Sequence, residues 1–148
     1  MTTPGTYALL LRVDLPTTIA IGALGQVELP AGWYLYLGSA RGPGGLAARL
    51  ARHKRKQAKR FHWHIDYVRA VATMVEIWSS EGADRRECQW AAAAAGLDGA
   101  MVIAPGLGSS DCRCRTHLFF YPRRPAFPRF EAMVATAVER EVLQRNPG

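Results

Sequence analysis

Three polar side chains stand close together in the stretch between residues 33 and 53. Tyr36 lies in a run of aromatic and aliphatic residues, and a glycine-rich break over residues 38–45 separates it from Arg49 and His53. Residues four positions apart lie on the same face of a helix. A strand, a break and a helix would therefore bring Tyr36, Arg49 and His53 to one spot, which serves either as an active site or as part of the scaffold.

The elements around this spot follow from local patterns. Residues 33–37 are rich in aromatic side chains, as strands are, whereas four glycines and a proline over residues 38–45 exclude regular structure. From Leu46 the pattern becomes helical, and Leu46 and His53 share one face with Arg49. The spacing predicts a helix over residues 46–53.

The rest of the chain alternates between β-prone and helical patterns. Short apolar runs predict further strands at residues 5–13, 72–78, 100–104 and 117–121, and a hairpin over residues 17–29. Helical patterns cover residues 62–69, 84–95 and about 129–145. The predicted fold class is α+β: a small, mostly antiparallel central sheet flanked by helices, with an extra N-terminal hairpin and a C-terminal helix.

Length and composition indicate one globular domain over residues 1–148. The chain is 49% hydrophobic and 21% charged, both ordinary for a soluble protein. The longest apolar run, residues 90–96, is too short to span a bilayer, and the N-terminus has no signal-peptide pattern. Three cysteines cannot form a closed disulfide framework. We therefore expect a cytoplasmic protein with no membrane partner, and the patterns do not set its oligomeric state.

Positive charge is concentrated directly after His53. The formal net charge is +7, and most acidic residues lie after position 75. This segregation favours a polyanionic partner, because lysine and arginine neutralise backbone phosphates. The segment that we expect to bind nucleic acid consists of Lys54, Arg55, Lys56, Lys59 and Arg60. A solvated basic surface is the simpler interpretation.

Glu87 fits a structural role without any chemistry. Asp84 is a good N-cap, Glu87 follows three residues later, and Gly96 can end the helix. This is the capping-box pattern, in which the Glu87 side chain would hydrogen-bond the backbone of Asp84.

Soft metal ligands occur late in the chain. Cys112, Cys114 and His117 lie close together, and Cys88 or the pair His62 and His64 could add to them. These are zinc ligands, but a C-x-C spacing lacks the two-residue gap of zinc fingers and ribbons. The spacing therefore favours a reduced loop without zinc, and zinc is the second choice of cofactor.

Short motifs in the first half of the chain resemble the GIY-YIG nuclease superfamily. The two name-giving tripeptides stand here as Gly5-Thr6-Tyr7 and Tyr36-Leu37-Gly38, followed by Arg49 and His53 on a helix. The chain is more closely similar to an uncharacterised prokaryotic branch that is sometimes fused to endonuclease III-type repair proteins. Its further matching motifs are His-Trp-His-Ile-Asp-Tyr, Glu-Cys and Gly-Ser-Ser-Asp-Cys-Arg-Cys. The resemblance covers residues 5–121.

The resemblance implies hydrolysis of phosphodiester bonds with one divalent metal ion, Mg²⁺ or Mn²⁺. By resemblance, Tyr7 or Tyr36 would lie at the attacking water, Arg49 would contact the phosphate and Glu87 would hold the metal. We count His53 among the candidate catalytic residues in a supporting role, because such a histidine more often supports a neighbouring residue than reacts itself. The implied partner is nucleic acid, with DNA favoured over RNA. A non-catalytic nucleic-acid-binding module on the same fold is the alternative function, and a zinc-stabilised interaction domain is a third.

Two features depart from the superfamily pattern. The interval from Tyr7 to Tyr36 is long, because the hairpin over residues 17–29 is inserted between them. The superfamily often has an asparagine late in the domain, whereas the only asparagine here is Asn146. Either Ser110, Asp111 or His117 takes its place, or no residue does.

Overall fold

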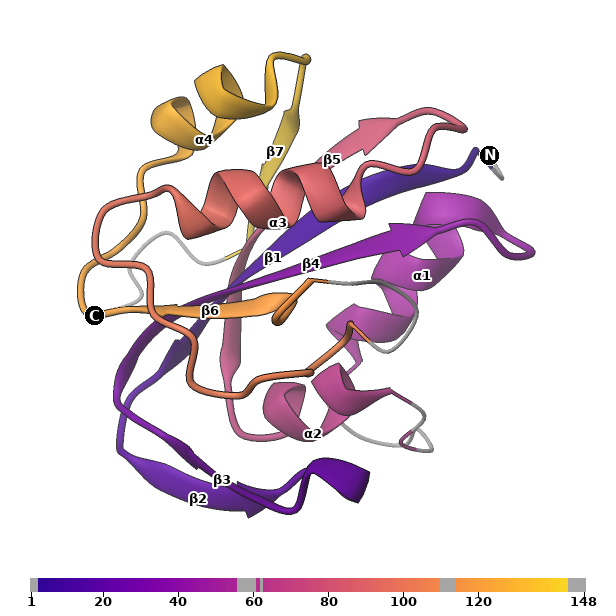
Figure 1. Ribbon diagram of the computed structural model, residues 1–148. Coiled ribbons are helices and arrows are strands. Elements are labelled where there is room, and N and C mark those ends of the chain that lie inside the picture. Colours follow the sequence, from indigo (N-terminus) through magenta and orange to yellow (C-terminus); the bar gives the residue numbers. More distant parts are fainter. Residues whose placement is uncertain (1–2, 56–60, 62, 110–113, 144–148) are drawn as a thin grey trace.

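The structure is a computed structural model that describes residues 3–55, 61, 63–109 and 114–143 (Figure 1). Its centre is an antiparallel sheet with the strand order β6-β4-β1-β5-β7. The strands are β1 (Gly5–Val13), β4 (Gly32–Ala40), β5 (Thr73–Glu81), β6 (Leu118–Tyr121) and β7 (Glu139–Val142). Every neighbouring pair is antiparallel. The predicted α+β class with an antiparallel central sheet is confirmed.

Both faces of this sheet are covered. One face packs against α1 (Gly45–Lys54), α2 (His64–Arg69) and a separate hairpin of β2 (Thr17–Ala20) and β3 (Gln26–Leu29), joined by the 3-10 turn Gly22–Leu24. The other face packs against α3 (Glu87–Ala95) and α4 (Phe127–Val134). Alternate residues of β1 enter the two cores, Leu9 and Leu11 in one, Ala8 and Leu10 in the other.

The inserted hairpin does not separate the two tyrosine-bearing strands. It forms its own two-stranded sheet, and β1 and β4 pair along their whole length. The register sets Tyr7 opposite Gly38 and Leu9 opposite Tyr36. Both tyrosines belong to the same hydrophobic core, so they lie on the same face of the sheet.

The C-terminal helix is shorter than predicted. The prediction of a helix over residues 129–145 is wrong for residues 135–143, because Ala135 adopts a left-handed conformation with φ 53°. Residues 144 and 145 lie outside the described residues. The chain then forms β7, which pairs antiparallel with the outer edge of β5. Covering an open sheet edge satisfies its backbone groups, which the local helical pattern could not reveal.

Two other predicted elements also differ. The strand predicted at residues 100–104 is reduced to a single bridge between Met101 and Phe120. The helix predicted from residue 84 begins at Glu87. Of the helices in the described residues, α1 is the longest with 10 residues, and none combines the length and apolar character needed to cross a bilayer.

Candidate functional site

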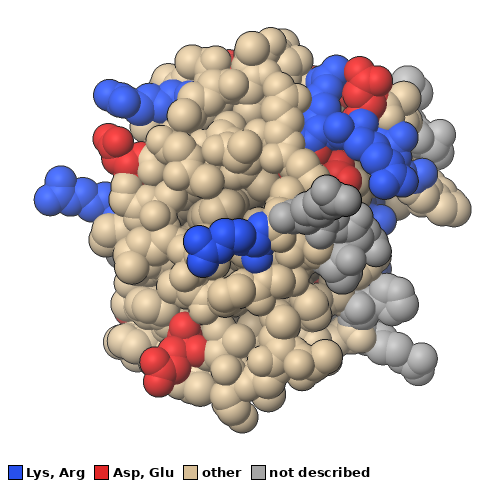
Figure 2. Space-filling view, viewed as in Figure 1, with Lys and Arg blue, Asp and Glu red and all other residues tan. Residues whose placement is uncertain are grey.

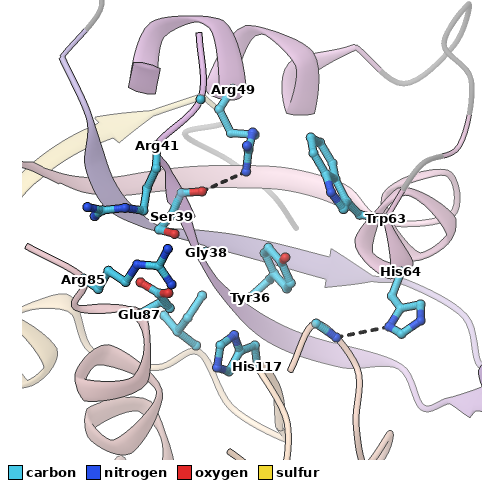
Figure 3. Close-up of a pocket in the computed structure, with 13 residues that line it drawn as sticks. Tyr36, Gly38, Ser39, Arg41, Arg49, Trp63, His64, Arg85, Glu87 and His117 are labelled. Carbon is cyan, nitrogen blue, oxygen red and sulfur yellow. Dashed lines mark hydrogen bonds between the residues drawn. The ribbon is translucent and has the colours of Figure 1, made fainter. Parts of the chain in front are cut away.

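A cavity of about 390 Å³ opens beside the C-terminal half of β4 (Figure 3). Because β6 pairs only with Trp33–Tyr36, the following residues of β4 form a wall of this cavity. Arg49 from α1, Glu87 from α3 and His117 from the segment before β6 also line it. The site thus combines elements from both faces of the sheet.

Arg49 is held against the wall by two contacts. Its Nη1 donates a hydrogen bond of 2.8 Å to the Ser39 carbonyl oxygen. Its guanidinium lies 4.3 Å from the centre of the Trp63 ring, and the Arg52 guanidinium lies at the same distance from that ring. Arg52 is fixed in turn by two hydrogen bonds of 2.7 Å to the buried carboxylate of Asp66. Trp63 therefore orients Arg49 in addition to packing against the core.

The two tyrosines occupy different depths. Tyr36 lines the cavity, whereas Tyr7 lies behind it, 1% exposed, with the ring centroids 6.4 Å apart. The Tyr7 hydroxyl is 2.7 Å from Nε2 of the buried His53. Gly38 lets the rings approach, because a Cβ there would lie 2.6 Å from the Tyr7 hydroxyl and 3.1 Å from the Tyr36 ring. The predicted convergence of Tyr36, Arg49 and His53 is thus present.

Both phenols are protonated at neutral pH, and burial makes them still weaker acids. Burial raises the pKa of Tyr7 to about 12, although the charge and hydrogen bonding of Arg49 act in the opposite direction. The pKa of Tyr36 is raised further, first by burial and then by neighbouring Tyr7. Burial also lowers the pKa of His117, against the effect of the Glu87 charge. Arg49 alone therefore does not make a tyrosinate at this site.

Glu87 does not form the capping box that the sequence predicts. The N-cap of α3 is Arg86, and the Asp84 side chain, 82% exposed, lies 3.5 Å from the Arg86 guanidinium. Because the helix starts later than predicted, Glu87 is its first residue. Its Oε2 is buried and has no hydrogen-bond partner among the residues that the structure describes. A carboxylate oxygen left unsatisfied on a cavity wall is suited to binding a hard cation.

His117 belongs both to the cavity and to a group of soft ligands. Its ligand atom and those of Cys88 and Cys114 all lie within 4.8 Å of one another. Of the other candidates in this region, Ser110, Asp111 and Cys112 lie outside the described residues. The sequence analysis grouped His117 with Cys114 and offered either Cys88 or the pair His62 and His64 as further ligands. The structure brings Cys88, from α3, to this group.

The predicted nucleic-acid-binding segment is described only at its start. Lys54 and Arg55 are exposed at the end of α1, and Lys54 Nζ lies 3.0 Å from Glu141 Oε2. The remaining members, Lys56, Lys59 and Arg60, lie outside the described residues. Figure 2 shows basic side chains gathered in the upper right, with acidic ones among them, where Figure 1 shows the start of α3 and the end of β4.

Sequence reasoning missed two basic residues and two supporting residues of the cavity. Arg41 and Arg85 line the same cavity as Glu87 and are exposed. Arg85 precedes Glu87 by two positions, which could have drawn attention to it. Ser39 and Trp63 act on Arg49 through contacts that no local spacing indicates.

Comparison with known proteins places the chain in a family. No curated protein and no solved structure matches it. The family described as "Domain of unknown function DUF123" has a model that matches residues 6–140. Since this match covers nearly the whole chain, the protein belongs to the DUF123 family.

Proposed function

We propose that this protein is a divalent-metal-dependent endonuclease that hydrolyses phosphodiester bonds in DNA. The observation that carries the proposal is the buried Oε2 of Glu87, to which no described residue donates a hydrogen bond. It lies in the same cavity as the Arg49 guanidinium and Tyr36. An anion-binding group, a metal-binding group and a polar group able to contact water are the parts that phosphoryl transfer needs.

The residues present fit Mg²⁺ or Mn²⁺. Glu87 offers a hard oxygen donor, and Mg²⁺ is commonly held by one or two carboxylates while it keeps several waters. When bound, the metal would neutralise charge that develops on the phosphate and polarise its oxygens. A cavity of about 390 Å³ has room for a hydrated ion beside a phosphate group.

Arg49 would bind the phosphate. Its guanidinium presents a planar fork of N–H donors that matches two phosphate oxygens. The Ser39 carbonyl and the Trp63 ring already fix its position. Binding phosphate therefore requires little further ordering of the side chain, which favours catalysis by positioning.

The tyrosines would act as protonated groups. Tyr36 is the one on the cavity wall, so its hydroxyl would orient the attacking water. Tyr7 lies behind it and donates to Nε2 of His53 when that imidazole carries its proton on Nδ1. This hydrogen bond fixes the orientation of the Tyr7 ring behind Tyr36.

Basic residues beyond the cavity would hold the DNA backbone. Lys54 and Arg55 start the positively charged segment at the end of α1 and are exposed. Contacts of this kind are independent of sequence and weaken as salt rises. The choice of DNA as substrate rests on the resemblance of the motifs to GIY-YIG nucleases.

A nicking assay tests this proposal. Supercoiled plasmid is incubated with the protein and Mg²⁺ or Mn²⁺, and the rate of relaxation is compared for wild type, Arg49→Ala and Arg129→Ala. We expect Arg49→Ala to lower the rate about 10³-fold, as loss of a phosphate-binding arginine does. Arg129, exposed on α4 and outside the cavity, is the matched control. Equal inactivity of wild type and Arg49→Ala would overturn the enzyme proposal.

A non-catalytic nucleic-acid-binding module is the second candidate. It is favoured by the exposed basic residues at the end of α1 together with two phenols whose ionisation burial makes harder. This function predicts salt-sensitive binding of DNA that needs no divalent metal. It also predicts that Glu87→Gln leaves the affinity unchanged, whereas the nuclease proposal predicts loss of metal-dependent cutting.

A further inference from the structure

Two cysteines and a histidine from distant parts of the chain meet beside the cavity. Cys88 lies in the first turn of α3, Cys114 in the segment before β6, and His117 directly before that strand. Their ligand atoms all lie within 4.8 Å of one another. This group differs from the Glu87 oxygen in its chemistry, since thiolate and imidazole are softer ligands than carboxylate.

The three ligand atoms lie nearly as close together as the ligands of a zinc ion do. Zinc binds thiolate at about 2.3 Å and imidazole nitrogen at about 2.0–2.1 Å. Ligand atoms around such an ion are therefore separated by roughly 3.5–3.8 Å. The ligand atoms of the two cysteines and the histidine lie within 4.8 Å of one another, so small side-chain rotations would bring them to this separation.

The backbone on both sides of the group is already fixed. The His117 amide donates to the Leu107 carbonyl at 2.8 Å, and its own carbonyl accepts from the Leu37 amide at 2.9 Å. Cys88 is held by α3, whose Trp90 is fully buried against the sheet. Two ligands thus come from anchored elements, as a metal site with little ordering cost requires.

We propose that Cys88, Cys114 and His117 bind one zinc ion, which links the first turn of α3 to the segment before β6. Three protein ligands leave a fourth position for water or another donor. Glu87 is the neighbour of Cys88 in the chain, so the link also fixes the position of the proposed magnesium ligand. The zinc site itself does not depend on the nuclease proposal. Only the idea that zinc positions Glu87 as a magnesium ligand rests on that proposal.

The first measurement is the zinc content of the full chain. The protein is produced with zinc in the medium, purified without chelator, and its metal is quantified. We expect one zinc per chain in wild type, and a loss of most of it in Cys88→Ser, Cys114→Ser and His117→Gln. Two controls keep their zinc: His64→Gln, a histidine of the same cavity, and Glu87→Gln, which removes the proposed magnesium ligand.

Cobalt substitution tests the ligands without relying on a variant that folds. Co²⁺ added to the chelator-treated wild-type protein should give the intense thiolate-to-cobalt charge-transfer absorption, and zinc should displace it. Three outcomes would overturn the proposal: no stoichiometric zinc together with no charge-transfer band, zinc retained in all three ligand variants, or a mass two hydrogens lower that reports a disulfide instead. If zinc binds while the Arg49 nicking test fails, the zinc site stands and the nuclease proposal falls.

Discussion

Glu76 and Glu87 are two acids with opposite surroundings: Glu76 is buried as a whole, whereas Glu87 is partly buried and has one buried oxygen, Oε2. The Glu76 side chain is 1% exposed, and its Oε1 accepts hydrogen bonds of 2.8 Å from both Trp78 Nε1 and Arg140 Nε. Its Oε2 accepts from Arg140 Nη2 at 2.9 Å and also from Arg124. Glu87, at the start of α3, has an Oε2 that finds no such partner in the described part of the chain.

The difference separates structure from function. A buried carboxylate that is fully hydrogen-bonded and paired with arginine has no capacity left for a ligand, and it holds the elements around it together. A buried oxygen without a partner carries a desolvation cost that a bound cation would offset. Glu76 therefore joins β5 to β7, whereas the Oε2 atom of Glu87 is placed to bind a cation.

Among substitutions of these acids, Glu87→Gln should have the largest effect, and that effect is on activity. If this oxygen holds the catalytic metal, the nicking rate should fall about 10²–10³-fold, the usual result of removing one electrostatic group from an active site. The melting temperature should not fall, because the described residues form no hydrogen bond to Oε2 that the substitution could remove.

The matched control is Asp84→Asn, three positions earlier and 82% exposed on its side chain. Nicking rates at saturating Mg²⁺ and thermal melts of both variants make the comparison. A melting temperature several degrees lower in Glu87→Gln, with an unchanged rate per folded molecule, would give Glu87 the structural role that Glu76 has.

The next effect is on stability, in Glu76→Gln. Removing one partner of a buried ion pair lowers the free energy of unfolding by about 3–5 kcal/mol. We expect about 3 kcal/mol, because the side chains of Arg124 and Arg140 are 35% and 44% exposed and water can solvate them. This corresponds to a fall of roughly 6–12 °C in melting temperature. Glu139→Gln, exposed on β7, is the control, and nicking below the melting transition should be unaffected.

Acid titration sharpens the same prediction. Burial opposes ionisation of Glu76, but hydrogen bonds from Arg140 and Trp78 and the charges of Arg140 and Arg124 outweigh it and lower the pKa. An acid with a lowered pKa in the folded state stabilises the fold above its unfolded pKa of about 4.3. This stability is lost as the pH falls through the folded pKa. Unfolding curves should therefore show a shallower acid limb in Glu76→Gln than in wild type.

Local sequence patterns were sufficient for half of the candidate site. Tyr36 and Arg49 belong to a strand, a turn and a helix that follow one another directly, so hydrophobic spacing alone brings them together. The antiparallel sheet and the inserted hairpin were also predictable, because strand and turn residues mark them. Contacts between elements that follow one another in the chain can therefore be predicted from local residue patterns.

The other half of the site depends on tertiary contacts. Asp84 and Glu87 satisfy a capping pattern, yet the backbone enters α3 only after Arg86, which no pattern of residue types specifies. Cys88 meets Cys114 because α3 and the segment before β6 pack side by side. Residues 139–142 form a strand because the edge of β5 is open to them. In each case a distant partner overrides local preference.

Tyr7 adds a third acid, a buried phenol, to the comparison of Glu76 with Glu87. Burial raises its pKa, and the opposing effect of Arg49 is too small to cancel this rise. The Tyr7 pKa of about 12 exceeds the unfolded value of about 10. The folded state therefore keeps a proton that the unfolded state releases, so stability is unaffected below pH 10 and falls between about pH 10 and 12. The contribution is up to about 1.4 kcal/mol per pH unit.

Tyr7→Phe should remove this part of the alkaline loss. Burial also raises the pKa values of Tyr34, Tyr36 and Tyr121. The quantity to measure is therefore the difference in the free energy of unfolding between wild type and variant, obtained from urea unfolding from pH 9 to 12. Tyr67→Phe, a half-buried tyrosine on α2, is the control. Parallel curves for wild type and Tyr7→Phe would contradict the expected proton uptake on folding.

The smallest effect concerns an acid at the surface. Glu141 Oε2 lies 3.0 Å from Lys54 Nζ, and the two side chains are 49% and 44% exposed. An ion pair this exposed contributes about 0–1 kcal/mol, so Glu141→Gln should barely change the melting temperature. It also releases Lys54, the first residue of the proposed phosphate-binding segment. DNA affinity should rise at low salt, and the slope of its logarithm against the logarithm of salt concentration should steepen by up to about 1. An unchanged slope would place Lys54 outside the DNA interface, because a lysine that contacts phosphate must release a counterion.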